Sequence, residues 1–96
     1  MTLLDEQEIE AALADRPGWN RRGVEITREF RLADFVGSVE FVGAVVEPAE
    51  RLGHHPDLSI SWNRVEVTIS THSEGGLTEA DFRLAGEIDR LQQVQP

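Results

Sequence analysis

The sequence contains no cysteine, and this absence narrows the chemistry open to the chain. Without thiols there is no disulfide, thiolate nucleophile, thiolate zinc site or iron–sulfur cluster, so any reaction must use oxygen and nitrogen groups. Histidine is scarce as well, with three residues in a chain of 96. These imidazoles, His54, His55 and His72, are therefore the first side chains to consider for chemistry near neutral pH.

Long apolar runs and basic patches are missing too. No stretch is long enough to cross a bilayer, and the N-terminal "MTLLDEQEIE" is acidic from its fifth residue, unlike a signal peptide. The net charge of -9 would repel the phosphate backbone of a nucleic acid. The nine basic residues are dispersed singly or in pairs, so they form no basic patch. We expect a cytoplasmic protein of one domain, residues 1–96, that binds neither membranes nor nucleic acid directly.

Apolar residues recur at helical spacing in three segments. Residues 5–15 predict a short amphipathic helix that ends at "RPG". Residues 34–53 predict a long helix with Asp34 as N-cap, Gly53 as C-terminal stop and Pro48 as the place of a kink or an early break. Its expected apolar stripe consists of Phe35, Val39, Val42, Val46 and Ala49. Residues 78–91 predict the last helix, capped by Thr78.

Apolar and polar residues alternate in residues 24–32, 58–62 and 65–70, which predicts strands. A further strand is expected near Trp19, and a two-residue turn at Asn63–Arg64 would join the last two strands. The order is then helix, strand, strand, helix, strand, strand, helix. Hairpin-joined strands and one-sided helices predict an α+β two-layer sandwich, in which a four-stranded antiparallel sheet has its helices on one face. The polar face and the edge strands favour pairing with another copy.

The expected hairpin places His55 opposite His72, so all three histidines should gather at one end of the sheet. Asp81 can join them, because it lies on the inward stripe of the last helix. A histidine cluster beside a carboxylate suits proton transfer near neutrality. A metal site is disfavoured, because adjacent residues such as His54 and His55 rarely reach one ion and no helical two-histidine zinc spacing is present.

Simpler interpretations exist for each of these residues. His54 and His55 can be a polar helix stop, and Asp81 can be only the acid of a capping box. Glu50 is most simply a solvated helix residue, and Trp62 is most simply a packing residue of a strand. The functional interpretation gains from convergence, because three distant segments bring titratable groups to one end of the sheet.

The chain resembles the pterin-4a-carbinolamine dehydratases. That family's signature runs from an acid to a histidine pair and Pro, then to an aromatic, a histidine and an Asp; here it is "ERLGHHP", Trp62, His72 and Asp81. The resemblance extends through "GW" at residues 18–19, "WNRVEVTISTH" and "GGLTEADFRLAGEID". It implies dehydration of 4a-hydroxytetrahydropterin to quinonoid dihydropterin, a step in tetrahydrobiopterin recycling linked to an aromatic amino-acid hydroxylase, with no metal or organic cofactor.

The resemblance also implies roles for individual residues. His54 and His72 match the family's catalytic acid–base pair, and His55 matches a histidine that holds substrate. Asp81 would orient an imidazole, and Glu50 is the acid that opens the signature. Many family members have Trp where this chain has Leu58, so Trp62 is expected to be the stacking partner of the pterin.

Two further hypotheses belong to other classes of function. Some relatives of this fold act as dimerisation partners of transcription factors or as assembly factors, which need only the scaffold. The presence of all four of His54, His55, His72 and Asp81 argues against that as the sole role. A histidine-switched binding protein is the third hypothesis. Self-association as a homodimer or homotetramer is expected in each case.

Overall fold

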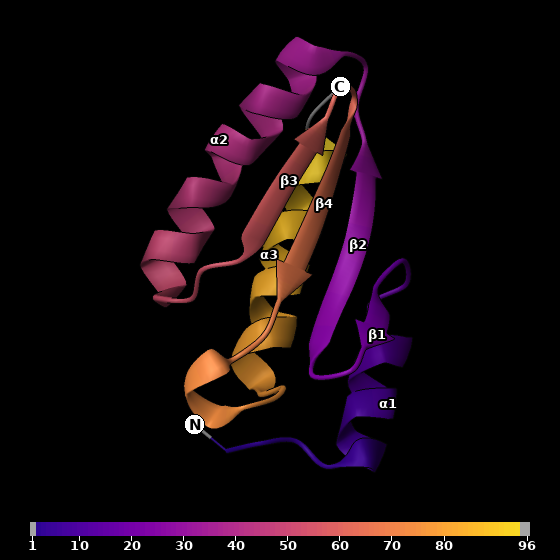
Figure 1. Ribbon diagram of the computed structural model, residues 1–96, viewed down its shortest axis with the longest axis vertical. Helices are drawn as coiled ribbons and strands as arrows, with labels where there is room; N and C mark the ends of the chain where they lie inside the picture. Colours follow the sequence, from indigo (N-terminus) through magenta and orange to yellow (C-terminus); the bar gives the residue numbers. More distant parts are fainter. Residues whose placement is uncertain (1, 95–96) are drawn as a thin grey trace.

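The strands form one four-stranded antiparallel sheet in the order β1-β2-β4-β3 (Figure 1). The structure is a computed structural model that describes residues 2–94. Its helices are α1 (Glu6–Ala14), α2 (Phe35–Leu52) and α3 (Glu79–Val94), and its strands are β1 (Asn20–Arg22), β2 (Glu25–Arg31), β3 (Asp57–Ser61) and β4 (Arg64–Ile69). The predicted α+β order is thus confirmed. A short 3₁₀ helix, η1 (His72–Glu74), is added between β4 and α3.

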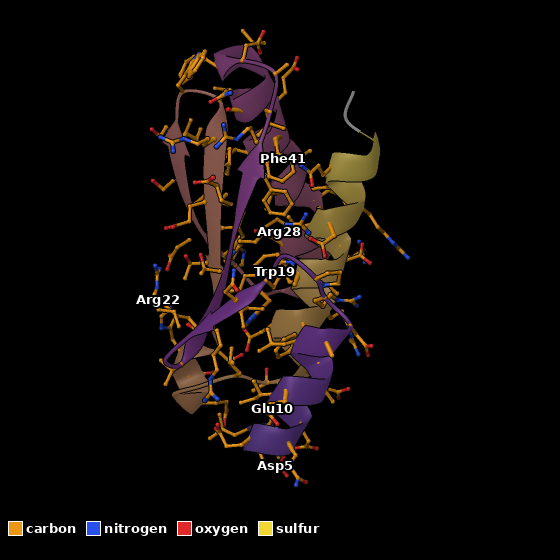
Figure 2. The ribbon with its side chains drawn as sticks, turned by 90° about the vertical axis from the view of Figure 1, so that its right-hand side faces the viewer. Asp5, Glu10, Trp19, Arg22, Arg28 and Phe41 are labelled. Carbon is orange, nitrogen blue, oxygen red and sulfur yellow. The ribbon has the colours of Figure 1, made fainter. Side chains whose placement is uncertain are left out.

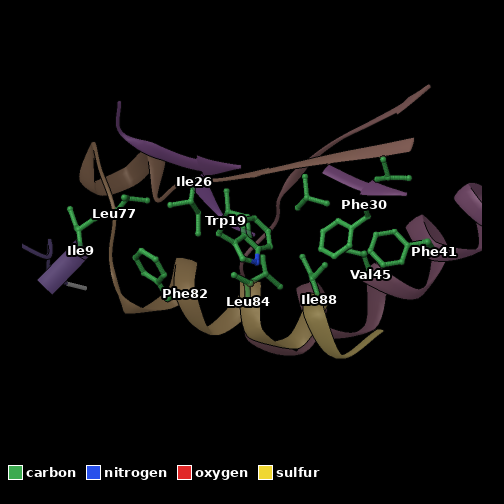
Figure 3. Close-up of a cluster of buried hydrophobic side chains, with 14 residues drawn as sticks. Ile9, Trp19, Ile26, Phe30, Phe41, Val45, Leu77, Phe82, Leu84 and Ile88 are labelled. Atoms are coloured by element: carbon green, nitrogen blue, oxygen red, sulfur yellow. The ribbon is translucent and has the colours of Figure 1, made fainter. Parts of the chain in front are cut away.

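All three helices cover the same face of the sheet (Figure 2). The core lies between the two layers, and the rings of Phe30 from β2 and Phe41 from α2 meet there at 4.8 Å between centroids (Figure 3). Trp19 joins them through an edge contact with Phe30, and its Nε1 donates to Asp89 of α3 at 2.9 Å. No helix in residues 2–94 is long and apolar enough to cross a membrane.

Helix α2 has two apolar faces rather than one. Its buried face consists of Ser38, Phe41, Val45, Pro48 and Ala49. The expected stripe is therefore wrong for most of its length, since Phe35, Val39 and Val46 are exposed. Periodicity alone could not choose between the two faces, because both repeat at three- and four-residue steps. The outer face stays uncovered within one chain.

The β3–β4 hairpin turns one position earlier than predicted. Ser61 pairs with Arg64, so Trp62 and Asn63 form the turn, and Trp62 adopts a positive φ of 51°. Ser38 Oγ donates to Trp62 O at 2.7 Å, and Leu32 N donates to Asn63 O at 2.7 Å. These tertiary contacts fix the turn backbone. The whole register is displaced by two residues, which keeps each side chain on its expected face but removes the predicted pairing of His55 with His72.

The histidine pair follows the C-terminal end of α2 directly, next to the sheet. The helix continues through the buried Pro48 to Leu52, so an early break there is wrong, whereas the stop at Gly53 is confirmed by its left-handed φ of 63°. His54 N donates to Ala49 O at 3.0 Å and closes the helix. Arg51 bonds Glu47 and also reaches Glu87 of α3 at 2.7 Å, and these two carboxylates raise the pKa of its guanidinium.

Replacing Gly53 tests whether this stop depends on backbone conformation. An added Cβ would meet nothing within 4 Å, so the cost of Gly53→Ala comes from the positive φ alone. We expect a loss of about 1 kcal/mol in the free energy of unfolding, and a smaller loss for Gly53→Asn, because Asn tolerates this conformation. Urea unfolding measures both. Equal stability of the Ala variant and the wild type would contradict this account of the helix end.

Candidate functional site

The carboxylate of Asp81 is the centre of the site. It lies in the first turn of α3 and is 0% exposed. Its Oδ1 lies 2.6 Å from His54 Nε2, and its Oδ2 accepts from Thr71 Oγ1 at 2.9 Å and from Thr78 N at 2.8 Å. A buried carboxylate is costly unless it is paired and hydrogen-bonded, and here both oxygens are occupied. Three distant segments are therefore joined at one group.

The two interpretations of Asp81 prove to be compatible. Thr78 precedes the first residue of α3, its Oγ1 accepts from Ala80 N at 3.3 Å, and its own N–H bonds Asp81 Oδ2. Asp81 thus closes the helix start as a capping acid would. The same carboxylate meets His54 through its other oxygen. Capping and contact with the imidazole therefore use different atoms of one side chain.

His54 and His72 reach the same end of the sheet by different routes. The side chain of His54 is 12% exposed against Asp81, just after the end of α2. His72 begins η1, is exposed, and lies 3.4 Å through Nε2 from Ser70 Oγ. Because His72 directly follows Thr71, whose hydroxyl bonds Asp81, the backbone of His72 lies at the end of the sheet where His54 meets Asp81. The sheet end thus carries one enclosed and one open imidazole.

His55 faces solvent beside the same helix end. Its Nε2 lies 2.6 Å from Glu50 Oε2, and the two side chains are 64% and 68% exposed. A side-chain contact this open to water adds little to the stability of the fold. In residues 2–94 no group of three or more His, Asp or Glu side chains is arranged to hold a metal ion. Each of the two neighbouring imidazoles instead faces one carboxylate.

Trp62 is not brought to the histidines. It occupies the β3–β4 turn with 68% of its surface exposed, whereas the histidines lie beyond Asp57 and Ile69 at the other ends of these strands (Figure 1). Leu58 is half-buried and packs against the core. Stacking of Trp62 on a pterin held at the histidine end would thus require Trp62 from another copy. The role expected for Trp62 stays a prediction.

Sequence reasoning missed the hydroxyl groups of the site. Ser70, Thr71 and Thr78 line the Asp81–His72 region, and all three are buried. Their only signal in the sequence is position, because Ser70 and Thr71 directly precede His72 and Thr78 caps the next helix. A hollow of about 840 Å³ borders this region at Thr78 and extends between α1 and α3, where Leu4, Arg16 and Phe82 help to line it. None of the histidines borders that hollow.

Comparison with known proteins places the chain in a protein family. The family model described as pterin 4 alpha carbinolamine dehydratase matches residues 2–91. A protein of Thermosynechococcus vestitus, provisionally named pterin-4-alpha-carbinolamine dehydratase, is 50% identical over 91 residues, which are 95% of this chain and 96% of that protein. A Chloroflexus aurantiacus protein of the same provisional name is 50% identical over 91 residues, covering 95% of this chain and 98% of its own.

Solved structures agree with the sequence matches. The crystal structure of a transcriptional coactivator/pterin dehydratase from Brucella melitensis superposes with a TM-score of 0.90 at 36% identity, covering 95% of this chain and 99% of that chain. A pterin dehydratase-like protein described as a RuBisCO assembly factor in the alpha-carboxysome shares the fold, with a TM-score of 0.62 at 20% identity over 77% of this chain and 86% of its own. This chain belongs to the pterin 4 alpha carbinolamine dehydratase family.

Proposed function

We propose that this protein dehydrates a 4a-hydroxytetrahydropterin to quinonoid dihydropterin and water. The observation that carries the proposal is the contact of His54 with the buried Asp81, beside a second imidazole at His72. Imidazoles exchange protons near neutral pH, and a positioned carboxylate orients the ring and stabilises its charged form. Family membership supports the pterin as the substrate class.

The reaction requires two proton transfers and no change of oxidation state. One group donates a proton to the hydroxyl on C4a, which leaves as water, while another removes the proton from N5 as the C4a=N5 bond forms. We assign these transfers to His54 and His72. The total number of protons on the protein is unchanged, and proton exchange with solvent returns each imidazole to its starting state before the next turnover. A positioned acid or base contributes roughly 10²–10⁴-fold to such a rate. No metal or organic cofactor enters the proposed reaction.

Substrate binding is assigned to the solvent-exposed side chains at the C-terminal end of α2. His55 and Glu50 form an exposed pair there, so both can turn towards a ligand at small cost. Asp81 contacts His54 rather than the substrate, because its side chain is fully buried. The proposed setting is cytoplasmic tetrahydrobiopterin recycling, where an aromatic amino-acid hydroxylase would supply the 4a-hydroxy substrate.

A second candidate function, binding to protein, is favoured by the outer face of α2. Four apolar side chains of that helix are about half exposed or more: Phe35, Val36, Val39 and Val46. Contiguous exposed apolar residues mark interaction sites on otherwise polar surfaces. The occupant that we propose is a second copy of this chain, because one stripe can pack against itself across a two-fold axis to form a homodimer or, with the free edges of β1 and β3, a homotetramer.

Removal of either proposed catalytic imidazole should slow dehydration strongly. We expect His54→Ala and His72→Ala each to lower kcat by roughly 10²–10⁴-fold, the contribution of one general acid or base. The substrate is generated in situ by a phenylalanine hydroxylase, and its decay is followed spectrally against the spontaneous rate. Unchanged thermal melting of His72→Ala serves as the fold control, because that side chain is exposed. No acceleration by folded wild-type protein would contradict the proposed enzyme.

Trp62 offers a test of whether one chain or two complete the site. Trp62→Asn removes the aromatic ring but suits the positive φ of the turn. We expect its KM to stay within about twofold of wild type, because Trp62 lies at the far end of the hairpin from the histidines of its own chain. Loss of a real stacking contact would cost about 0.5–1.5 kcal/mol and would raise KM. A KM raised about fivefold or more would instead support stacking on Trp62 from another copy.

Charge on the outer face of α2 should disrupt self-association. Val39→Glu places a carboxylate in the centre of the exposed stripe, where it would be buried without a partner in a dimer. We expect at least about a tenfold weaker association with little change in the monomer fold, because Val39 is already exposed in one chain. Sedimentation velocity over a concentration series measures this. A monomeric wild-type protein would contradict the proposed assembly.

A further inference from the structure

Two hydrogen-bond donors from neighbouring segments converge on one oxygen of Asp81, Oδ2. Thr71 Oγ1 donates to Asp81 Oδ2 at 2.9 Å and lies 2.8 Å from Thr78 Oγ1. Ala80 N in turn donates to Thr78 Oγ1. Thr78 N supplies the second donor to Asp81 Oδ2. Thr71 and Thr78 are therefore bonded to each other and both donate to one oxygen of the carboxylate.

These hydrogen bonds determine which oxygen of Asp81 faces His54. Two donors occupy Oδ2, which leaves Oδ1 to face His54 Nε2 at 2.6 Å. A carboxylate that serves as acceptor on every side requires a proton on the facing nitrogen. His54 Nε2 must then carry that proton, and a neutral imidazole keeps its lone pair on Nδ1. In residues 2–94 no hydrogen bond to His54 Nδ1 is formed.

We infer that Thr71 is a positioning residue: with Thr78 it orients the Asp81 carboxylate so that His54 is held as the Nε2–H tautomer and exchanges protons with the substrate through Nδ1. The substrate part of this inference rests on the proposed dehydration. A proton taken from or given to the pterin moves to or from Nδ1, while the Nε2–H bond to Asp81 persists. No proton has to reach the buried carboxylate, and no further reactant is needed.

The tautomer is measured directly by long-range ¹H–¹⁵N NMR of protein labelled in its histidine rings, at mildly alkaline pH where imidazoles are neutral. The resonances of His54 are assigned by their loss in His54→Gln. We expect Nε2 to give a pyrrole-type shift and Nδ1 a pyridine-type shift in wild-type protein. A His54 ring that is mainly the Nδ1–H tautomer, or that averages as free imidazole does, would overturn the inference.

Variants at Thr71 separate positioning from packing. Thr71→Val keeps the shape of the side chain but removes its hydroxyl, and Thr71→Ser keeps the hydroxyl. We expect the Val variant to lose the fixed tautomer and to lower kcat by about tenfold with KM within about twofold, and the Ser variant to restore both. Thr68→Val is the matched control, because Thr68 lies on β4 and bonds Thr27 rather than Asp81. A Val variant identical to wild type in both readouts would contradict the role of Thr71.

The two readouts keep this inference distinct from the proposed function. The ring tautomer of His54 needs no substrate, so it can be determined even if the protein dehydrates no pterin. A fixed Nε2–H tautomer in an inactive wild-type protein would contradict the dehydratase proposal and leave the positioning by Thr71 intact. Activity together with an Nδ1–H tautomer would contradict the positioning alone. If Thr71→Val fails to fold, Thr71→Ala takes its place, because it also removes the hydroxyl that bonds Asp81, and a fixed tautomer in that variant would contradict the role of Thr71.

Discussion

Burial of the Asp81 carboxylate is the constraint on which the candidate site depends. A charged group taken out of water is costly unless its acceptor positions are satisfied, and a lost partner would leave that cost uncompensated. Here the donors come from Thr71 after β4 and from Thr78 at the start of α3, while His54 approaches from the end of α2. The carboxylate therefore requires these segments to meet. Among the side chains of residues 2–92, no buried polar atom is left without a partner.

Much of the fold followed from periodicity, and its failures have identifiable physical causes. The element order, the cap at Asp34 and the stop at Gly53 were predicted, because each rests on local backbone and side-chain chemistry. The hairpin register was not, because contacts from Ser38 and Leu32 fix a turn that local propensity places one position later. The buried face of α2 was missed because two apolar stripes share one helix.

The candidate site was predictable in its titratable groups and not in its hydroxyls. His54, His72 and Asp81 were expected at one end of the sheet, and the structure brings them there through Thr71 rather than through a pairing of His55 with His72. Serine and threonine are common residues, so the only feature of the sequence that marks Thr71 is its position directly before His72. The fold alone does not decide function, since a RuBisCO assembly factor shares it at 20% identity. The side chains at this end of the sheet must decide it.

The most direct test of the account is to map where a stable pterin binds. A 7,8-dihydropterin lacks the hydroxyl that would leave, so it can be titrated into ¹⁵N-labelled protein without turnover. We expect shifts to concentrate at His54, His55 and His72 and at the neighbouring backbone of Ser70 and Thr71. Shifts confined to the hollow between α1 and α3, around Arg16 and Phe82, or no saturable shifts at all, would contradict it.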